Sequence, residues 1–554
     1  MADFKNKVVY QIYPKSFKDS NGDGIGDLRG VIDALDYLAD MGVDYLWLTP
    51  FFVSPQKDNG YDIADYLAID PHFGTMDDFD AMVKAANAKG LKIMLDMVLC
   101  HTSDQHAWFR RALAGDESYQ RYYILRDGRN KKSADDPGEP PTNWQCAFGG
   151  SDWQWEPRLG KWYLHLHDVS QPDLDWTNPT VRDELAKVVR FWKERGVAGF
   201  RFDVINLVAK PEVFADDTQG LGRRLFADGP HIHEYLQELV HSAGIGDMVT
   251  VGEMASTDLE NCILYTRPAN HELSMTFSFQ HLKVDYKDGD KWALMPPDMM
   301  RLKQLFAAWQ TGMAKAGGWN ALFWCNHDQP RIVSRLGDDK EYREASAKML
   351  AACIHLMRGT PYIYIYQGEE LGMTNAGYTS IADYRDVERL NYYRILREQG
   401  KTEAEALTIL AARSRDNGRT PMQWSAGPYA GFSTREPWSP LAKNHAAIHV
   451  EAAQKDEHSI LAFYRRLIQL RHEMPIIAEG DIRWIEEDNP DVIAYERTWQ
   501  GEQLTVLCNF RPTAVHLRHL SLQDFADARK LLGNYPGREE CLRPYEVLAL
   551  YRRA

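Results

Sequence analysis

The sequence predicts an α/β fold: a (β/α)8 (TIM) barrel with a small domain inserted after strand 3 and a C-terminal antiparallel β-domain. Three observations predict it. Runs of β-forming residues alternate with helical patterns along most of the chain, as expected for parallel strands joined by crossover helices. Three of these runs end in an acidic residue, at the position where barrels carry their active sites. The alternation is interrupted once by a long irregular segment, and short strands replace the helices at the end of the chain.

The first third of the chain supplies three strands and two helical segments. Ile32, Leu35 and Leu38 share one helical face. Thr75 begins a helix with the pattern of a capping box, and this helix ends near Gly90. The β-rich runs are bounded by Gly and Pro and span Val8–Pro14, Tyr45–Pro50 and Leu91–Cys100.

The middle of the chain continues the same rhythm. Asn178-Pro179 opens a helix that ends at Gly196. Its apolar stripe has helical spacing and consists of Val181, Leu185, Val188 and Trp192. The remaining barrel strands are expected at Gly199–Ile205, Met248–Met254, Met275–Phe279, Ala321–Asp328 and Tyr362–Tyr366.

Two departures from this rhythm mark the other domains. Residues 104–170 are irregular, rich in Gly, Pro, Asp and Trp, and too long for a simple loop. After about Glu479 short strands take over, with a hairpin turn at Trp499–Glu502 before the strand Leu504–Phe510 and a last strand at Val547–Tyr551. We therefore expect the barrel at 1–103 and 171–478, the inserted domain at 104–170 and the C-terminal β-domain at 479–554.

Three short segments carry the acids that end the strands. They are Gly199–Asp203, Val251-Gly252-Glu253 and Asn326-His327-Asp328. Any one of them alone is a weak signal, but carboxylates that meet at one rim suit a glycosidase, which needs a nucleophile and an acid/base. Arg201 lies two residues before Asp203, where a positive charge keeps a carboxylate ionised.

Composition limits the possible partners. The net charge of −15 argues against nucleic acid and against an anionic membrane surface. The longest apolar stretch, Met349–Tyr366, is interrupted by His355 and Arg358 and is no membrane span. Seven Cys without regular spacing and no apolar segment at the N-terminus indicate a cytoplasmic protein with reduced thiols. We expect a monomer or a small homo-oligomer.

The order of these motifs resembles the α-amylase superfamily, family thirteen of the glycoside hydrolases. Further matches are Gln11–Pro14, Asp96–His101 and Arg419–Trp424. The resemblance implies that Asp203 is the nucleophile, that Glu253 is the acid/base and that Asp328 stabilises the transition state. It also implies that five residues grip the glucosyl ring: Asp62, His101, Arg201, His327 and Arg415.

Two positions depart from the family pattern. Cys100 stands where the family usually has Asn, which affects one hydrogen bond near the site. The eighth strand at Tyr362–Tyr366 is two residues longer than usual, a change that preserves side-chain alternation.

The loop from Asp19 to Asp27 has two interpretations. Oxygen-bearing side chains at alternate positions, separated by Gly, resemble the first half of a calcium loop. In related enzymes a structural Ca2+ ion would use Asp19, Asn21, Asp23, the Ile25 carbonyl and Asp27. The alternative is a tight polar turn whose acids cap the next helix.

Within the superfamily the chain looks most like the group of oligo-1,6-glucosidases and trehalose-phosphate hydrolases. Val204 after the nucleophile is typical of α-1,6- and trehalose-phosphate-cleaving relatives rather than α-1,4-cleaving ones. The segment Val251–Thr257 resembles the phosphate-cleaving branch more than the isomaltose-cleaving branch. The loop after the sixth strand provides cations for a phosphate, namely His281, Lys283 and Lys291. The alternative for this loop is a solvated surface segment.

The resemblance therefore implies a retaining α-glucosidase that acts on a small phosphorylated disaccharide, trehalose 6-phosphate, and yields glucose and glucose 6-phosphate. Three alternatives stay open: an oligo-1,6-glucosidase, a sucrose or trehalose isomerase, and an inactive partner of a transporter. The three intact acids speak against the last of these.

Overall fold

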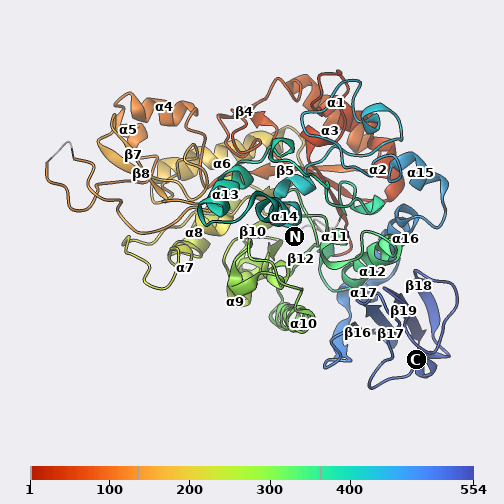
Figure 1. Cartoon of the computed structure of the whole chain (residues 1–554). Coiled ribbons are helices and arrows are strands. Elements are labelled where there is room, and N and C mark those ends of the chain that lie inside the picture. Colours follow the sequence, from red (N-terminus) through yellow and green to blue (C-terminus); the bar gives the residue numbers. More distant parts are fainter. Residues whose placement is uncertain (1–2, 134–135, 362–364, 554) are drawn as a thin grey trace.

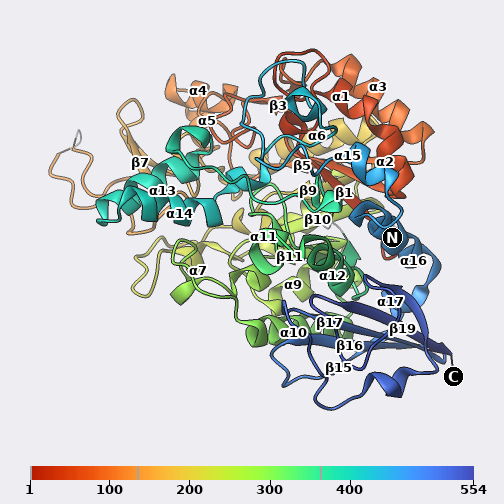
Figure 2. The same ribbon diagram turned by 45° about the vertical axis from the view of Figure 1, so that its right-hand side comes forward.

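The computed structural model describes residues 3–133, 136–361 and 365–553. Figure 1 shows a parallel barrel surrounded by helices, with the small inserted sheet at one side and an antiparallel C-terminal sheet at the other. Figure 2 shows the same arrangement turned by 45°, with the C-terminal strands below the barrel helices.

The central sheet is parallel. Seven strands follow in the order β11-β10-β9-β5-β2-β1-β14, and β12 pairs with β13. A parallel bridge from Thr276 to Asn320 links β11 to the start of β12. The strands are β1 (Val9–Ile12), β2 (Tyr45–Leu48), β5 (Lys92–Met97), β9 (Gly199–Phe202), β10 (Val249–Met254), β11 (Met275–Ser278), β12 (Ala321–Leu322), β13 (Thr360–Pro361) and β14 (Ile365–Tyr366).

The parallel strands thus continue through β12 to β13 at one end and through β1 to β14 at the other. This arrangement of parallel strands confirms the predicted barrel. Residues 362–364, most of the segment predicted as a longer eighth strand (Tyr362–Tyr366), lie outside the described residues. β2 and β10 are buried at every position, since helices cover the outside of a parallel sheet while side chains fill its interior.

Helices follow the strands, and two of the predicted helix starts are confirmed. Thr75 and Asp78 form a capping box at the start of α3, and Asn178 caps α6 with Pro179 in the first turn. The barrel helices are α1 (Leu28–Asp33), α2 (Leu35–Met41), α3 (Met76–Ala88), α6 (Pro179–Glu194), α8 (Ile232–Ala243), α9 (Leu259–Thr266), α10 (Met299–Ala316), α11 (Ile332–Leu336) and α12 (Arg343–His355).

Two element boundaries differ from the prediction. The helical face from Ile32 to Leu38 is divided between α1 and α2, because the chain leaves helical geometry at Ala34. The strand predicted over Ala321–Asp328 is only the two residues of β12. Residues 323–328 follow as a loop that leads to the rim, and the positions after Pro361 on the neighbouring strand, residues 362–364, lie outside the described residues.

The segment between β5 and α6 carries a small antiparallel sheet. Its order is β6-β8-β7. Bridges from His101 to Asp173 and from Tyr123 to Leu174 tie it to the barrel. Its elements are α4 (Ala107–Leu113), α5 (Glu117–Gln120), β6 (Leu125–Arg126), β7 (Trp153–Glu156) and β8 (Lys161–Leu164). A separate antiparallel pair, β3 (Phe52–Val53) and β4 (Asp65–Ile69), lies earlier in the chain between β2 and α3.

The chain ends in a five-stranded antiparallel sheet of order β15-β16-β17-β19-β18. The predicted hairpin turn is confirmed: Trp499 pairs with Glu502, and Gln500 and Gly501 have φ of 48° and 78°, as a tight two-residue turn requires. The strands are β15 (Asp481–Ile485), β16 (Val492–Trp499), β17 (Glu502–Asn509), β18 (Arg529–Gly533) and β19 (Val547–Arg553).

Helices between the last barrel strand and this sheet complete the fold. They are α13 (Val387–Glu398), α14 (Glu403–Arg413), α15 (Val450–Lys455), α16 (Ile460–Glu473) and α17 (Pro475–Glu479). Across the described ranges, no helix has the length and apolarity needed to cross a bilayer.

Candidate active site

A cleft of about 560 Å3 opens at the C-terminal ends of the barrel strands. Asp203 follows β9, Glu253 lies near the end of β10, and Asp328 lies on the loop after β12; all three line the cleft. Their side chains come from different strands, and the barrel brings them together because parallel strands end at one rim. The volume is in the range that encloses a small ligand.

Arg201 joins two of the three carboxylates. Its Nη1 donates to Asp203 Oδ1 at 2.7 Å and to Asp96 Oδ1 at 2.6 Å, and its Nη2 contacts Glu253 Oε2. Burial alone would lower the pKa of Arg201, but Asp96 and Asp203 raise it well above its ordinary value. Arg201 is fully buried and lies behind the cleft wall. Its contacts position the acids, while a direct contact with the sugar ring, which the resemblance implied, stays a prediction.

A turn of unusual geometry fixes Asp203. Val204 has φ of 35°, which is strained for a β-branched residue. Asn206 then bonds to Ala255 in both directions, its Nδ2 donating to the Ala255 carbonyl at 2.8 Å and its Oδ1 accepting from the Ala255 amide at 2.9 Å. The ends of β9 and β10 are thus locked together, and with them Asp203 and Glu253.

Asp328 is held as an anion. Arg419 Nη2 donates to its Oδ1 at 2.7 Å and Arg415 Nη1 at 3.2 Å, while His327 Nε2 lies 3.1 Å from its Oδ2. Burial raises the pKa of Asp328, but His327, Arg415 and Arg419 hold it well below its usual range.

His327 is fully buried behind Asp328. Its ring stacks on Tyr61, with ring centroids 5.1 Å apart, and its Nδ1 lies 2.8 Å from Gln11 Nε2. His327 therefore orients Asp328. It is not one of the described residues that line the cleft.

Asp58, and not Asp62, reaches the cleft. Asp62 is fully buried, and its oxygens accept from Ser54 Oγ and from the backbone amides of Lys57 and Asp58. Asp58 lines the cleft and accepts from Arg415 Nη2 at 3.0 Å. The prediction for Asp62 is therefore corrected: Asp62 folds the loop that presents Asp58. The sequence contains both acids, but nothing in its pattern indicated which of the two side chains would reach the cleft.

His101 and Arg415 lie where they were predicted, on the cleft wall. His101 Nε2 lies 3.2 Å from Gln171 Nε2, which in turn donates to Asp58. Arg415 also donates to both oxygens of Asp386, at 3.0 and 2.8 Å. Arg415 thus ties Asp58, Asp328 and Asp386 into one inner wall.

Cys100 makes a different contact from the Asn of the family pattern. Its Sγ lies 3.2 Å from Asp173 Oδ1, which also accepts from Lys210 Nζ at 2.9 Å. The thiol of Cys100 thus donates a hydrogen bond to Asp173. All seven cysteines are free thiols.

The three residues predicted to bind a phosphate have three different environments in the structure. Lys283 lines the cleft. Lys291 also lines it, but its Nζ is bound by both oxygens of Glu388, at 2.8 and 2.7 Å. His281 turns away into a different cavity, where its Nε2 lies 2.7 Å from the Phe323 carbonyl oxygen.

The prediction for His281 is therefore wrong. The physical reason is the short 3-10 helix η4 (Gln280–Lys283). With three residues in each turn, side chains two positions apart point in different directions. Lys283 and His281 consequently face different cavities.

The Asp19–Asp27 loop is a network of side-chain oxygens and backbone amides. Asp19 accepts from the amides of Asn21, Gly22 and Gly24 and from Ser433 Oγ, which fills its acceptor positions. Asp27 caps α1 by accepting from the Gly30 amide. Over the described ranges, no group of three or more His, Cys, Asp or Glu side chains gathers to hold a metal ion.

This network fits the polar-turn interpretation, while the calcium interpretation stays a prediction. Asn21 and Asp23 each accept one backbone amide through a single oxygen, so they keep free acceptor positions. An ion here would have to replace hydrogen bonds of Asp19.

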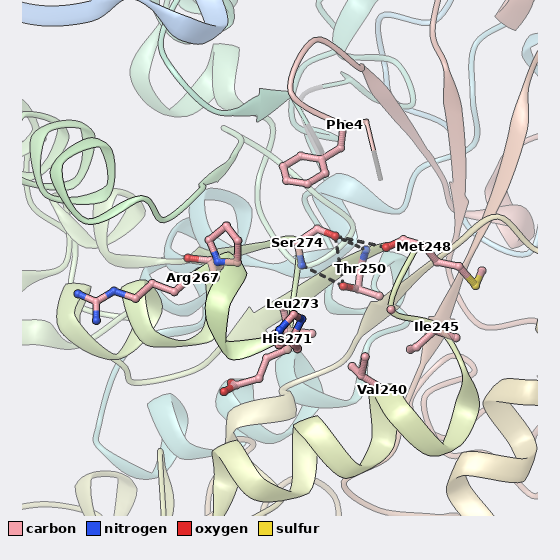
Figure 3. A pocket seen from close by; sticks show the side chains of 13 residues that line it. Phe4, Val240, Ile245, Met248, Thr250, Arg267, His271, Leu273 and Ser274 are labelled. Carbon is pink, nitrogen blue, oxygen red and sulfur yellow. Dashed lines mark hydrogen bonds between the residues drawn. The ribbon is translucent and has the colours of Figure 1, made fainter. Parts of the chain in front are cut away.

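A second cavity, of about 70 Å3, lies at the opposite end of the barrel. Figure 3 shows it beside the N-terminal ends of β10 and β11, where Thr250 and Ser274 bond to each other and Phe4 projects over them. The Glu272 carboxylate at this cavity accepts from Gln237 and contacts His233. It is therefore engaged in structural contacts and lies far along the strands from the three acids.

Comparisons with known proteins agree with this geometry. The family model "Alpha amylase, catalytic domain" matches residues 11–480. The chain is 50% identical to trehalose-6-phosphate hydrolase of Bacillus subtilis, over 99% of this chain and 98% of that protein. It is 54% identical to the enzyme of the same name from Escherichia coli, over 91% and 90% of the two chains.

Solved structures extend the comparison. Trehalose-6-phosphate hydrolase of Bacillus licheniformis superposes with a TM-score of 0.93 at 47% identity and covers 100% of both chains. A trehalulose synthase from Pseudomonas mesoacidophila superposes with a TM-score of 0.92 at 38% identity and covers 99% of both.

Proposed function

This chain belongs to the α-amylase family of glycoside hydrolases, and from that premise we propose that it hydrolyses trehalose 6-phosphate to glucose and glucose 6-phosphate. It does so with retention, through a covalent glucosyl-enzyme intermediate. The observation that carries the proposal is the guanidinium of Arg201, which contacts both Asp203 and Glu253. A shared partner keeps the two carboxyl groups close together, and a close pair is the arrangement of retaining enzymes.

The two acids divide the chemistry. Asp203 attacks the anomeric carbon, and Glu253 gives its proton to the departing oxygen. Glu253 then removes a proton from water, which releases the glucosyl unit from Asp203 with net retention. Arg201 donates to Asp203 Oδ1 at 2.7 Å and so holds this carboxyl group in position for the attack.

The inner wall around Arg415 supports the position of the glucosyl ring. Asp328 remains an anion, so it can stabilise the positive charge that develops on the ring in the transition state. Asp58 and His101 lie on the same wall and offer hydrogen-bonding groups to the ring hydroxyls. The leaving sugar then occupies the outer cleft, which Lys283 lines.

The identities of the relatives favour the phosphorylated substrate. The trehalose-6-phosphate hydrolases are 50–54% identical to this chain. The oligo-1,6-glucosidase of Halalkalibacterium halodurans is 43% identical over 98% of both chains. That activity and isomerisation, as the name of the trehalulose synthase indicates, are the alternative functions.

The setting of the enzyme is part of the proposal. Seven free thiols, six of them buried, suit a reducing compartment, and we place the protein in the cytoplasm as a monomer or small homo-oligomer. Its partner is a small phosphorylated disaccharide, with no nucleic acid and no membrane.

The test of the function is a comparison of three substrates under the same conditions. We expect kcat/KM on trehalose 6-phosphate to exceed that on trehalose and on isomaltose by at least about 10-fold, the worth of one charge-assisted contact. Equal or higher values on isomaltose would transfer the assignment to oligo-1,6-glucosidase. Products with rearranged linkages would indicate an isomerase.

A further inference from the structure

Two cations on the wall of the outer cleft have no anionic partner among the described residues. They are Lys283, on the turn after β11, and Arg223, on the short helix α7 (Arg223–Phe226) that follows the nucleophile strand β9. No hydrogen bond or ion pair within the described ranges involves either side chain. Their proximity is visible in the pKa of Lys283, which burial and the Arg223 cation both lower.

The other charges at this end of the cleft are either anionic or already paired. Asp288, Asp290 and Glu388 line it as acids. Lys291 is held by both oxygens of Glu388. A dianionic ligand would therefore be repelled everywhere along this wall except at the two free cations.

Arg223 is presented by a rigid loop. Asp217 accepts from the backbone amides of Gln219 and Gly222, and these bonds do not need the side chain of Arg224. Gly222 has φ of 90°, and a side chain at this position would collide with Trp144. The loop is thus fixed immediately before Arg223, and little conformational freedom is lost when Arg223 takes up a ligand.

We propose that Arg223, together with Lys283, binds the phosphate group of the leaving sugar and so determines the preference for a phosphorylated substrate. Arg223 offers a planar fork of N–H donors that suits two phosphate oxygens, and Lys283 adds a point charge. The inference rests on the proposed function. It replaces His281 and Lys291 of the sequence-based hypothesis with one residue that the sequence did not single out.

The test compares Arg223→Gln with Arg224→Gln, its neighbour on the same helix. Arg224 is a matched control because its guanidinium is bound to Asp217 at 2.6 Å. For Arg223→Gln we expect the ratio of kcat/KM on trehalose 6-phosphate to kcat/KM on trehalose to fall about 10- to 100-fold. This fall should result from a higher KM for trehalose 6-phosphate and not from a lower kcat. In Arg224→Gln the ratio should equal that of the parent enzyme. Arg223→Lys should recover part of the loss, since it restores the charge without the fork.

A second readout uses the product. Glucose 6-phosphate should inhibit cleavage of an aryl α-glucoside by the parent enzyme more strongly than glucose does, and Arg223→Gln should remove this difference. Melting temperatures of the variants show that they are folded.

The outcomes separate the two levels of the proposal. A parent enzyme without preference for trehalose 6-phosphate contradicts the proposed function itself. A parent enzyme with that preference, combined with an unchanged ratio in Arg223→Gln, overturns the role of Arg223 alone. Equal losses in Arg223→Gln and Arg224→Gln would also overturn it, because the loop would then act only through its fold.

Discussion

The side chain of Arg201 contacts the carboxyl groups of Asp96, Asp203 and Glu253 together. Without it, the carboxylates of Asp203, Glu253 and Asp96 would face one another in a buried space. Like charges at such distances raise one another's pKa and prevent simultaneous ionisation. The guanidinium offsets these charges by contacting all three carboxyl groups, and it holds Asp203 and Glu253 at one place in the cleft.

The division of roles between Asp203 and Glu253 predicts the effect of their amide variants. Asp203→Asn removes the nucleophile and should abolish nearly all turnover. Glu253→Gln should lose about 10^2- to 10^4-fold on trehalose 6-phosphate, the usual worth of general acid–base catalysis. On an aryl glucoside, the rate at which Glu253→Gln forms the covalent intermediate should fall less, because that leaving group needs no proton.

The exposed Glu260→Gln serves as the control for a lost carboxylate. Near-normal turnover in either amide variant on both substrates would contradict the roles assigned to Asp203 and Glu253. Melting temperatures near that of the parent enzyme show that the loss is chemical.

The buried carboxyl group of Asp152 should make the stability of the protein depend on pH. It is fully buried, its oxygens have no hydrogen-bond partner in the described structure, and burial raises its pKa from 3.8 to about 8. The folded state therefore keeps this proton between about pH 4 and 8, while the unfolded state loses it. As the pH rises through that window, the free energy of unfolding of the parent protein falls relative to that of Asp152→Asn. The fall is up to about 1.4 kcal/mol for each pH unit.

Melting temperatures measured from pH 5 to 9 check this. The gap in favour of Asp152→Asn should widen up to about pH 8 and then stay constant. Asp40→Asn, at an exposed position, is the control for the loss of one acidic group. A gap that does not change with pH would show that Asp152 is ionised in the folded protein.

At the residue scale, sequence reasoning located strand ends well and side-chain directions poorly. Asp203, Glu253 and Asp328 were predictable because each follows a β-rich run, and parallel strands end at one rim. Asp58 and Arg223 were not, because Asp58 lies on a loop and Arg223 begins the one-turn helix α7 directly after one, and the conformation of both segments depends on distant partners such as Arg415 and Trp144.

At the element scale, the turn after β9 and the loop before α1 show how loops depend on the rest of the fold. The turn after β9 is strained at Val204 and is compensated by the bonds between Asn206 and Ala255. The loop before α1 is held by Asp19 and Asp27 and reaches Ser433 on a distant segment. Local sequence predicted the caps of α3 and α6, because capping needs only neighbouring residues.

We propose that the Asp19–Asp27 loop binds calcium with low affinity, through Asn21, Asp23, the Ile25 carbonyl and the two terminal acids. Because Asp19 already accepts four donors, binding has to replace some of them. Added calcium should still raise the melting temperature, since an ion that binds only the folded state stabilises it by mass action.

Chelator should lower the melting temperature again, and Asp23→Asn should weaken the response without a change in kcat. A melting temperature that ignores both reagents would leave the polar turn as the interpretation of this loop.

At the scale of the whole molecule, the chemistry and the C-terminal sheet occupy different sides of the barrel. The acids lie at the C-terminal ends of the strands, whereas β17 and β19 pack on α12 and β15 packs on α10. Lys303 of α10 anchors this contact by donating to the carbonyl of Glu486 at 2.7 Å. Figure 2 shows the C-terminal sheet beside these helices. The barrel rim is therefore left to the inserted segment and to α13, which bear on the cleft.

Asp203 and Glu253 lie close together through Arg201, which predicts a retaining enzyme. Proton NMR can follow the hydrolysis of trehalose 6-phosphate during the first minutes, before the released glucose mutarotates. We expect the first free glucose to be the α-anomer, because two displacements at one carbon restore its configuration. Initial release of β-glucose would mean a single displacement by water, and would contradict both the covalent intermediate and the role of Asp203.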